Sequence, residues 1–292
     1  MRVLRSMLVM PANRADMLAK SPTYGADALV FDLEDSVPVA EKQKARELAR
    51  EFIEKHKASN TIYVRVNSVQ AGMLSADLEA IAVDGVVGVR LAKTESPEAV
   101  RTLDAMLTEY EGKRGLPQGS IEIQTSLESA KGVWLAHEIA SASPRIRTVM
   151  CGTAQDGDLQ ADLGYKWTAE GNAVYYHRSR VMLAARAAGV EQVLDGSHPN
   201  FRDPQGLRIA CEAARALGYR GKSVIHPSQI ETVNEVFTPT AQELDYYRRV
   251  IEAFDAALAR GSAATSVDGT MVDYAMVATS KQMLAWAESL GR

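Results

Sequence analysis

The segment Ala28-Leu29-Val30-Phe31-Asp32-Leu33, followed at once by Glu34 and Asp35, decides the fold class. It opens with four consecutive apolar residues and lacks the polar alternation of a half-exposed strand. Such a run is typical of a strand buried on both faces, and parallel sheets bury both faces because helices cover each side. The segment therefore predicts a parallel strand with two carboxylates directly after its carboxyl end.

The same pattern recurs along the chain, where short β-type runs alternate with longer helical stretches. The predicted strands are residues 5–10, 28–33, 61–67, 85–91, 120–125, 147–152, 191–196 and 222–225. Eight βα units in about 225 residues favour an α/β fold of the (β/α)8 TIM-barrel type. A doubly wound open sheet is the alternative. It usually carries a glycine-rich first turn, and the sequence has no GxGxxG or GxxxxGK[ST] motif.

Helix signals fall between the predicted strands. Apolar residues at positions 45, 48, 49, 52 and 53 form one amphipathic face. Ser96-Pro97 and Asp203-Pro204 are typical helix starts, each with a capping side chain before a proline. The segment 240–243 (Thr-Ala-Gln-Glu) reads as a capping box and predicts a further helix after it.

We predict a barrel over residues 1–227 and a helical C-terminal extension over 228–292, which could act as a lid. Within the extension, the segment 261–272 is small and polar. Its composition favours a plain surface loop, and a mobile segment near an active site is the alternative.

Composition limits the class of protein. The chain has 292 residues, of which 46% are hydrophobic and 24% charged, as in ordinary globular proteins. Its net charge of −4 argues against general binding to nucleic acid or anionic lipid. Cys151 and Cys211 are too few for a disulfide-stapled fold, and we expect buried thiols. No apolar run approaches the ~18 residues of a membrane span, so we expect a cytoplasmic protein without a membrane partner.

A TIM barrel carries its active site at the carboxyl ends of its strands. Carboxylates follow the second, fifth and sixth predicted strands, and an arginine lies in the third. These residues are Glu34 and Asp35, Glu128, Asp156 and Asp158, and Arg65. Further polar residues at these ends are Asn13, Arg14, Lys93, Glu95, Asp195, His198 and His226.

Carboxylates that converge on a small volume repel one another unless a cation joins them. Oxygen ligands without a Cys/His cluster suit Mg²⁺ or Mn²⁺, and Mg²⁺ commonly takes one or two protein carboxylates and keeps positions for water and substrate. The strand ends therefore predict an open, catalytic metal site. For each carboxylate taken singly, capping a helix N-terminus is the alternative.

Several motifs run in order along almost the whole chain. They are residues 5–14, 27–37, 64–67, 127–130, 158–164, 225–230 and 268–273. Together they resemble the citrate lyase β-subunit (CitE-like) family within the HpcH/HpaI aldolase group. The family fold is a (β/α)8 barrel with a helical C-terminal extension, in agreement with the pattern of the strands.

The resemblance implies a Mg²⁺-dependent carbon–carbon lyase, or the reverse aldol or Claisen condensation. Substrates in the family are often coenzyme A thioesters of short 3-hydroxy acids, such as malyl-CoA, citramalyl-CoA or citryl thioesters. Two alternatives stay open: a CoA-independent metal aldolase for hydroxy-oxo acids, and a non-catalytic barrel that binds an acyl-CoA or an oxo-acid. A homo-oligomer is also implied, with a trimer as the expected form.

The resemblance also assigns roles to barrel residues. Glu128 and Asp158 match the metal ligands of the family. Glu34 and Asp35 match residues that hold metal-bound waters, and Arg65 matches the arginine that binds the oxo-acid. Physical chemistry agrees, because a guanidinium can pair with a carboxylate through two parallel hydrogen bonds and so orient it.

Other assignments rest on fewer residues. Asp273 matches a carboxylate that serves as acid or base in CoA-dependent members and often reaches a neighbouring subunit. Arg14 and Lys20 are candidates for the phosphates of coenzyme A, or else solvated surface charges. The loop after the sixth strand is longer than usual in the family, which leaves Asp156 as an alternative to Asp158.

Overall fold

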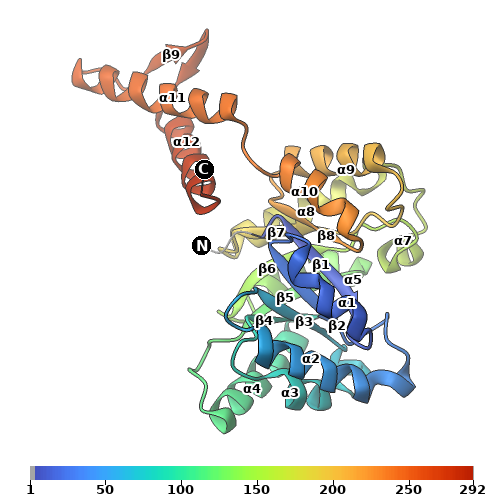
Figure 1. The fold of residues 1–292 in the computed structure, drawn as a ribbon. Helices are drawn as coiled ribbons and strands as arrows, with labels where there is room; N and C mark the ends of the chain where they lie inside the picture. The colour runs from blue at the N-terminus through green and yellow to red at the C-terminus, as the bar shows by residue number, and fades with distance from the viewer. Residues whose placement is uncertain (1–3, 292) are drawn as a thin grey trace. The chain divides into compact units, whose positions relative to one another are not determined.

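The computed structural model describes residues 4–291, and the chain divides into two compact units, Leu4–Asn234 and a second unit that begins at Glu235 (Figure 1). The first unit is a closed barrel of eight parallel strands in sequential order, which confirms the predicted TIM barrel. The strands are β1 (Ser6–Pro11), β2 (Ala28–Asp32), β3 (Ile62–Val66), β4 (Gly88–Leu91), β5 (Glu122–Leu127), β6 (Ile146–Cys151), β7 (Gln192–Asp195) and β8 (Gly221–Val224).

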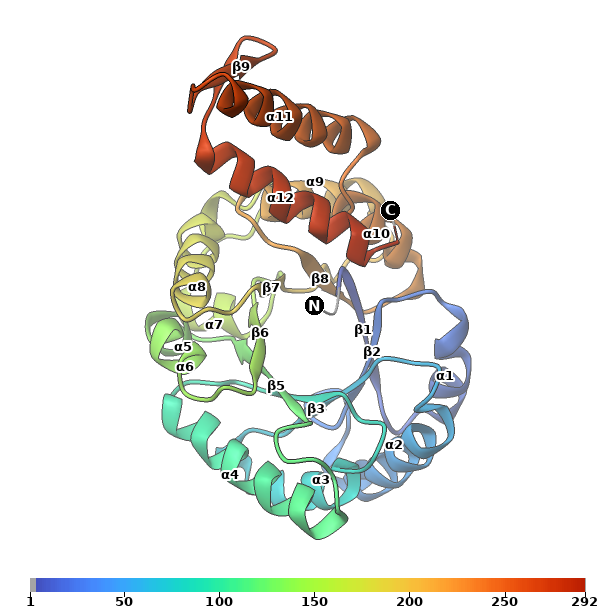
Figure 2. The same ribbon diagram turned by 90° about the vertical axis from the view of Figure 1, so that its left-hand side faces the viewer.

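Figure 2 shows the strands as a ring with the barrel helices outside it. The helices are α1 (Ala15–Lys20), α2 (Lys42–His56), α3 (Leu74–Ile81), α4 (Pro97–Arg114), α5 (Ala130–Trp134), α6 (Ala136–Ala140), α7 (Asp158–Leu163), α8 (Tyr175–Ala187) and α9 (Pro204–Ala216), with α10 (Ile230–Val236) after the last strand. Ser96 and Asp203 cap α4 and α9 through their side chains, as their sequence signals predict.

The interior of the barrel changes from apolar to polar along the strands. A buried cluster that includes Met7, Val30 and Tyr63 fills one part. Beyond it, the parallel register aligns Asp32 with Arg65, Arg65 with Arg90, and Arg90 with Gln124 across four consecutive strands. We call these four residues the polar row. It brings charged groups from distant parts of the sequence to one level of the barrel.

The second unit contains α11 (Ala241–Ala259), α12 (Tyr274–Ser289) and, between them, a hairpin of β9 (Thr265–Val267) and β10 (Thr270–Val272). The capping box at Thr240 and Glu243 is present. The prediction of a plain loop over 261–272 is wrong for residues 265–272, which form this hairpin, whereas residues 261–264 lie in neither a helix nor a strand. The turn of the hairpin, Asp268-Gly269, has φ of 50° and 79°, values that suit a two-residue hairpin turn.

Apolar packing explains why the hairpin forms. Val267 and Val272 are buried in a cluster with Val250, Phe254 and Val277 of the two helices. The predicted boundary after Pro227 and the role as a lid stay predictions. Among residues 4–291, no helix combines the length and the apolar character that crossing a membrane requires.

Candidate active site

Asp32 organises the turn that follows β2. Its side chain is fully buried, and its carboxylate accepts hydrogen bonds from the backbone N–H of Glu34 at 2.9 Å and of Ser36 at 3.0 Å, and from the Ser36 hydroxyl. Arg65 donates to the same carboxylate from Nε at 2.6 Å and from Nη2 at 2.7 Å. Asp32 therefore both shapes the turn that carries Glu34 and Asp35 and orients the Arg65 guanidinium.

Sequence reasoning missed Asp32 as a positioning residue. One signal was present, since Asp32 is a charged residue at the end of an otherwise apolar strand. A buried carboxylate needs partners that satisfy its oxygens. Burial alone would raise the pKa of Asp32, but the hydrogen bonds and charge of Arg65 hold that pKa below its ordinary value.

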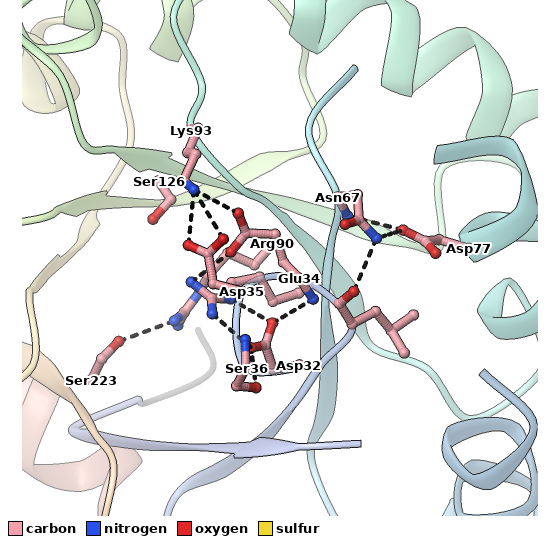
Figure 3. Close-up of polar contacts among 12 residues, drawn as sticks. Asp32, Glu34, Asp35, Ser36, Asn67, Asp77, Arg90, Lys93, Ser126 and Ser223 are labelled. Atoms are coloured by element: carbon pink, nitrogen blue, oxygen red, sulfur yellow. Dashed lines mark hydrogen bonds and ion pairs between the residues drawn. The ribbon is translucent and has the colours of Figure 1, made fainter. Parts of the chain in front are cut away.

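Lys42 also stabilises the turn that carries Glu34 and Asp35. Its buried ammonium donates to the carbonyl oxygens of Leu33 at 2.6 Å and Glu34 at 2.8 Å, and to Asn67 Oδ1 at 2.9 Å. Asn67 is held in turn by Asp77, which accepts from its backbone N–H at 2.9 Å and its side-chain amide at 2.7 Å (Figure 3). All three ammonium donors of Lys42 are thus used to fix the turn.

Two cations hold the carboxylates that follow β2. Glu34 lies between Arg65, whose Nη1 is 3.2 Å from Oε2, and Lys93, whose Nζ is 3.0 Å from Oε1. Lys93 also contacts Asp35 at 2.8 Å (Figure 3). Its Nζ lies 3.8 Å from Asp158 Oδ2. Lys93 thereby links the carboxylates after β2 to the one after β6.

The two carboxylates after β2 differ in ionisation. Burial raises the pKa of Glu34, although the charge of Arg65 opposes the shift. For Asp35, burial is outweighed by hydrogen bonding to Lys93, so its pKa is lowered. These carboxylates in turn raise the pKa of Lys93 against the effect of its own burial. Asp35 and Lys93 are therefore both charged at neutral pH.

Glu128 and Asp158 meet at a cavity. Glu128 directly follows β5, is buried, and accepts a hydrogen bond from the Ser126 hydroxyl. Asp158 is the first residue of α7 and is exposed. Both line a cavity of about 190 Å³ and an adjoining one of about 270 Å³. Burial raises the pKa of Glu128, and the negative charge of Asp158 adds to the shift.

The first cavity has lining residues from seven of the strands or the loops after them. They include Val9, Arg65, Arg90, Glu128, Met150, Gly152, Asp158 and Ser223. The structure thus brings together, directly or through Lys93, the five barrel residues that the sequence predicts for catalysis and metal binding: Glu34, Asp35, Arg65, Glu128 and Asp158.

Glu128 and Asp158 are the residues that could hold a metal ion. Two carboxylates beside an open cavity fit Mg²⁺, which commonly keeps several waters and binds one or two protein carboxylates. In residues 4–291, no group of three or more His, Cys, Asp or Glu side chains is placed for a metal cage made of protein ligands alone. A cation here would also offset the repulsion that raises the pKa of Glu128.

The remaining candidates lie elsewhere. Arg14, at the start of α1, forms an exposed ion pair with Asp16 at 3.1 Å, and Lys20 ends the same helix. Neither residue lines either of the two cavities, and neither does the exposed Asp156. In the second unit, Asp273 caps α12 and accepts from the N–H of Ala275 at 2.9 Å. The proposed roles of Arg14, Lys20 and Asp273 stay predictions.

The fold and the site define a TIM barrel with an acidic pocket, flanked by arginine, at the carboxyl ends of its strands. The chain belongs to the HpcH/HpaI aldolase/citrate lyase family, whose model matches residues 5–227. This membership confirms the resemblance drawn from the motifs.

Individual relatives match nearly the full length. The citrate lyase subunit beta of Leuconostoc mesenteroides subsp. cremoris is 34% identical over 290 residues, 99% of this chain and 94% of the relative. The (3S)-malyl-CoA thioesterase of Cereibacter sphaeroides is also 34% identical over 290 residues, 98% of this chain and 95% of the relative.

Two solved structures of similar proteins contain bound ligands. The protein CitE of Mycobacterium tuberculosis, crystallised with magnesium, acetoacetate and coenzyme A, is 31% identical with a TM-score of 0.77, and the match covers 99% of this chain and 100% of that chain. The citrate lyase beta subunit of M. tuberculosis with oxaloacetate and magnesium is 31% identical with a TM-score of 0.67, over 82% of this chain and 99% of that chain.

Proposed function

We propose that the protein is a Mg²⁺-dependent carbon–carbon lyase that cleaves, or forms by aldol or Claisen-type condensation, a short 3-hydroxy acyl-CoA thioester of malyl, citramalyl or citryl type. The pair of Glu128 and Asp158 beside Arg65 in one cavity carries the proposal. Mg²⁺ held by these carboxylates would act as a Lewis acid toward the keto oxygen of an oxo-acid.

Arg65 binds and orients the oxo-acid. Asp32 holds Nε and one N–H of Nη2, which fixes the plane of the guanidinium. A guanidinium has five N–H donors, so Arg65 keeps further donors for a carboxylate in the cavity that it lines. Because Asp32 and Glu34 raise its pKa despite burial, Arg65 stays charged.

Other residues take supporting roles. Glu34 and Asp35 hold waters next to the metal site, and Lys93 keeps Asp35 ionised by a direct ion pair. Asp273 is the acid that protonates the thioester enolate left by cleavage. Arg14 and Lys20 bind the coenzyme A phosphates. The active form is a cytoplasmic homo-oligomer, for which a trimer is the form expected in light scattering.

Calorimetric titration with oxaloacetate, pyruvate or glyoxylate, with and without Mg²⁺, tests the site. We expect oxo-acid binding that requires Mg²⁺ and is lost in Glu128→Gln. The control is Glu109→Gln on α4, an exposed glutamate paired with Lys113 on the outside of the barrel. Added affinity with acetyl-CoA supports a CoA-linked substrate, whereas its absence favours a CoA-independent aldolase. Failure of every oxo-acid to bind refutes the proposal.

A thioester hydrolase is the second candidate function, favoured by the similarity to a (3S)-malyl-CoA thioesterase. Product analysis separates the two reactions. A lyase converts malyl-CoA to an oxo-acid and acetyl-CoA and releases no free thiol. Hydrolysis consumes water and gives malate and free coenzyme A, which a thiol reagent detects.

A further inference from the structure

Arg90 is a buried arginine that contacts no carboxylate among the residues that the structure describes. It lies in the polar row on β4 and is only 1% exposed. Its Nη1 donates to Ser223 Oγ at 3.1 Å (Figure 3). Its Nε donates to Gln124 Oε1 at 3.2 Å, and Nη2 lies 3.3 Å from Met7 Sδ. All three partners are neutral, and one is only a thioether sulfur.

The other buried arginines of the barrel differ from Arg90. Arg145 pairs with Glu111 at 2.7 Å. Arg178 pairs with Asp195 at 2.9 Å. Within residues 4–291, Arg90 forms no ion pair, and two of its five N–H donors have no protein acceptor. A buried charge without a counter-charge destabilises the folded state.

A structural role explains this arrangement poorly. Met7 and Met150 lie beside the Arg90–Ser223 contact, so an unbranched apolar side chain would suit these surroundings. Burial and the repulsion from Arg65 lower the pKa of Arg90 to about 10, so the guanidinium is still charged at neutral pH. The charges of Glu128 and Asp32 oppose this shift in pKa, but no carboxylate among residues 4–291 forms an ion pair with Arg90.

The location of Arg90 indicates which kind of ligand could neutralise its positive charge. Arg90 lines the same cavity of about 190 Å³ as Arg65 and Glu128. The charge of Arg65 is already countered by Asp32 and Glu34. Arg90 therefore adds to this cavity a positive charge that no described carboxylate contacts, beside the metal site proposed at Glu128 and Asp158.

We propose that Arg90 is a specificity-determining residue whose positive charge, in contact with no described carboxylate, favours ligands that bring a second negative charge into the barrel cavity. The inference rests on the proposed function, because it concerns the oxo-acid site. It adds that the site distinguishes dianionic from monoanionic oxo-acids through this residue.

The test compares Arg90→Met and Arg90→Lys with the unchanged protein. Calorimetry in Mg²⁺ measures affinity for oxaloacetate, a dianion, and for pyruvate, a monoanion. In Arg90→Met we expect affinity for oxaloacetate to fall by about tenfold to a hundredfold and affinity for pyruvate by less than about threefold. Arg90→Lys keeps the charge and restores most of the preference. Arg147→Met, at an exposed position of β6, is the matched control and changes neither affinity.

Thermal stability gives a second readout that a structural role would move in the opposite direction. Since the substitution removes an unpaired buried charge, the ligand-free Arg90→Met protein should melt at the same temperature or higher. A lower melting temperature together with equal losses for both oxo-acids would overturn the inference. If Arg90→Met does not fold, Arg90→Gln supplies the same comparison.

The outcomes separate the two proposals. If the unchanged protein binds no oxo-acid, both the proposed function and the inference fail. If it binds both oxo-acids, and the ratio of their affinities is the same in Arg90→Met and Arg90→Gln, only the inference fails.

Discussion

Replacing Asp32 by asparagine removes one charge from the site and keeps the shape of the side chain. The carboxylate of Asp32 is fully buried and accepts five hydrogen bonds, two from Arg65, one from Glu34 and two from Ser36. The asparagine amide turns an NH₂ group toward some of these donors. Arg65 would then keep Glu34 as an ion-pair partner at 3.2 Å, with the charge of Glu128 acting on it as well.

The expected loss of stability is large. Removing one partner of a buried ion pair costs about 3–5 kcal/mol. At about 2–4 °C per kcal/mol for a domain of this size, the barrel transition should fall by about 6–20 °C. Asp84→Asn is the matched control, because Asp84 pairs with Lys57 at 2.6 Å on the exposed surface. An exposed pair contributes less than about 1 kcal/mol.

Thermal denaturation followed by circular dichroism measures both variants over a range of pH. Because Arg65 holds the pKa of Asp32 below its ordinary value, the stabilisation is present above the unfolded pKa of about 4 and is lost as the pH falls through the folded pKa. The difference in melting temperature between Asp32→Asn and the unchanged protein should therefore become smaller below about pH 4. The reasoning would be refuted if Asp32→Asn lowered the melting temperature no more than Asp84→Asn does. It would also be refuted if the difference in melting temperature from the unchanged protein did not depend on pH.

Two further predictions concern the interior. A Cβ at Gly152 would lie 2.6 Å from Glu128 Cγ, so Gly152→Ala should displace the Glu128 carboxylate. Calorimetry should then show Mg²⁺ binding weakened by about tenfold. Gly112→Ala is the control, because no atom lies closer than 3.6 Å to a Cβ there, and it should leave Mg²⁺ binding unchanged. Burial raises the pKa of Cys151 to about 12 and that of Cys211 to about 11. A thiol reagent at pH 8 should therefore label neither cysteine before denaturation and both afterwards, and rapid labelling of the native protein would contradict their burial.

Strand ends were predictable because the apolar runs are long and uninterrupted. The run before Glu34 marks β2, and the polar residues after such runs must meet at one end of a parallel barrel. Glu128 and Asp158 could be anticipated for this reason, and both line the same cavity. The predicted bounds of the strands differ from the observed ones by at most three residues; the largest difference is in β4, which begins at Gly88 rather than at residue 85.

The partners of buried charges could not be predicted. Asp32 and Arg90 lie within strands, and which groups they meet depends on the register between strands and on the far side of the barrel. The hairpin after α11 is a different case. Its Asp268-Gly269 dipeptide is a turn signal in the sequence, but the burial of Val267 and Val272 depends on helices that pack only in three dimensions.

The polar row also bears on how the barrel folds. Because side chains alternate along a strand, a slip of one residue in the pairing of β3 would turn Arg65 away from Asp32 and into the apolar layer beneath the helices. A mispaired barrel would then bury an unmatched guanidinium in that layer and an unmatched carboxylate inside the ring, at a cost of several kcal/mol. The polar row therefore destabilises intermediates with the wrong strand register. The charges that line the pocket of the native protein also favour correct pairing of the strands during folding.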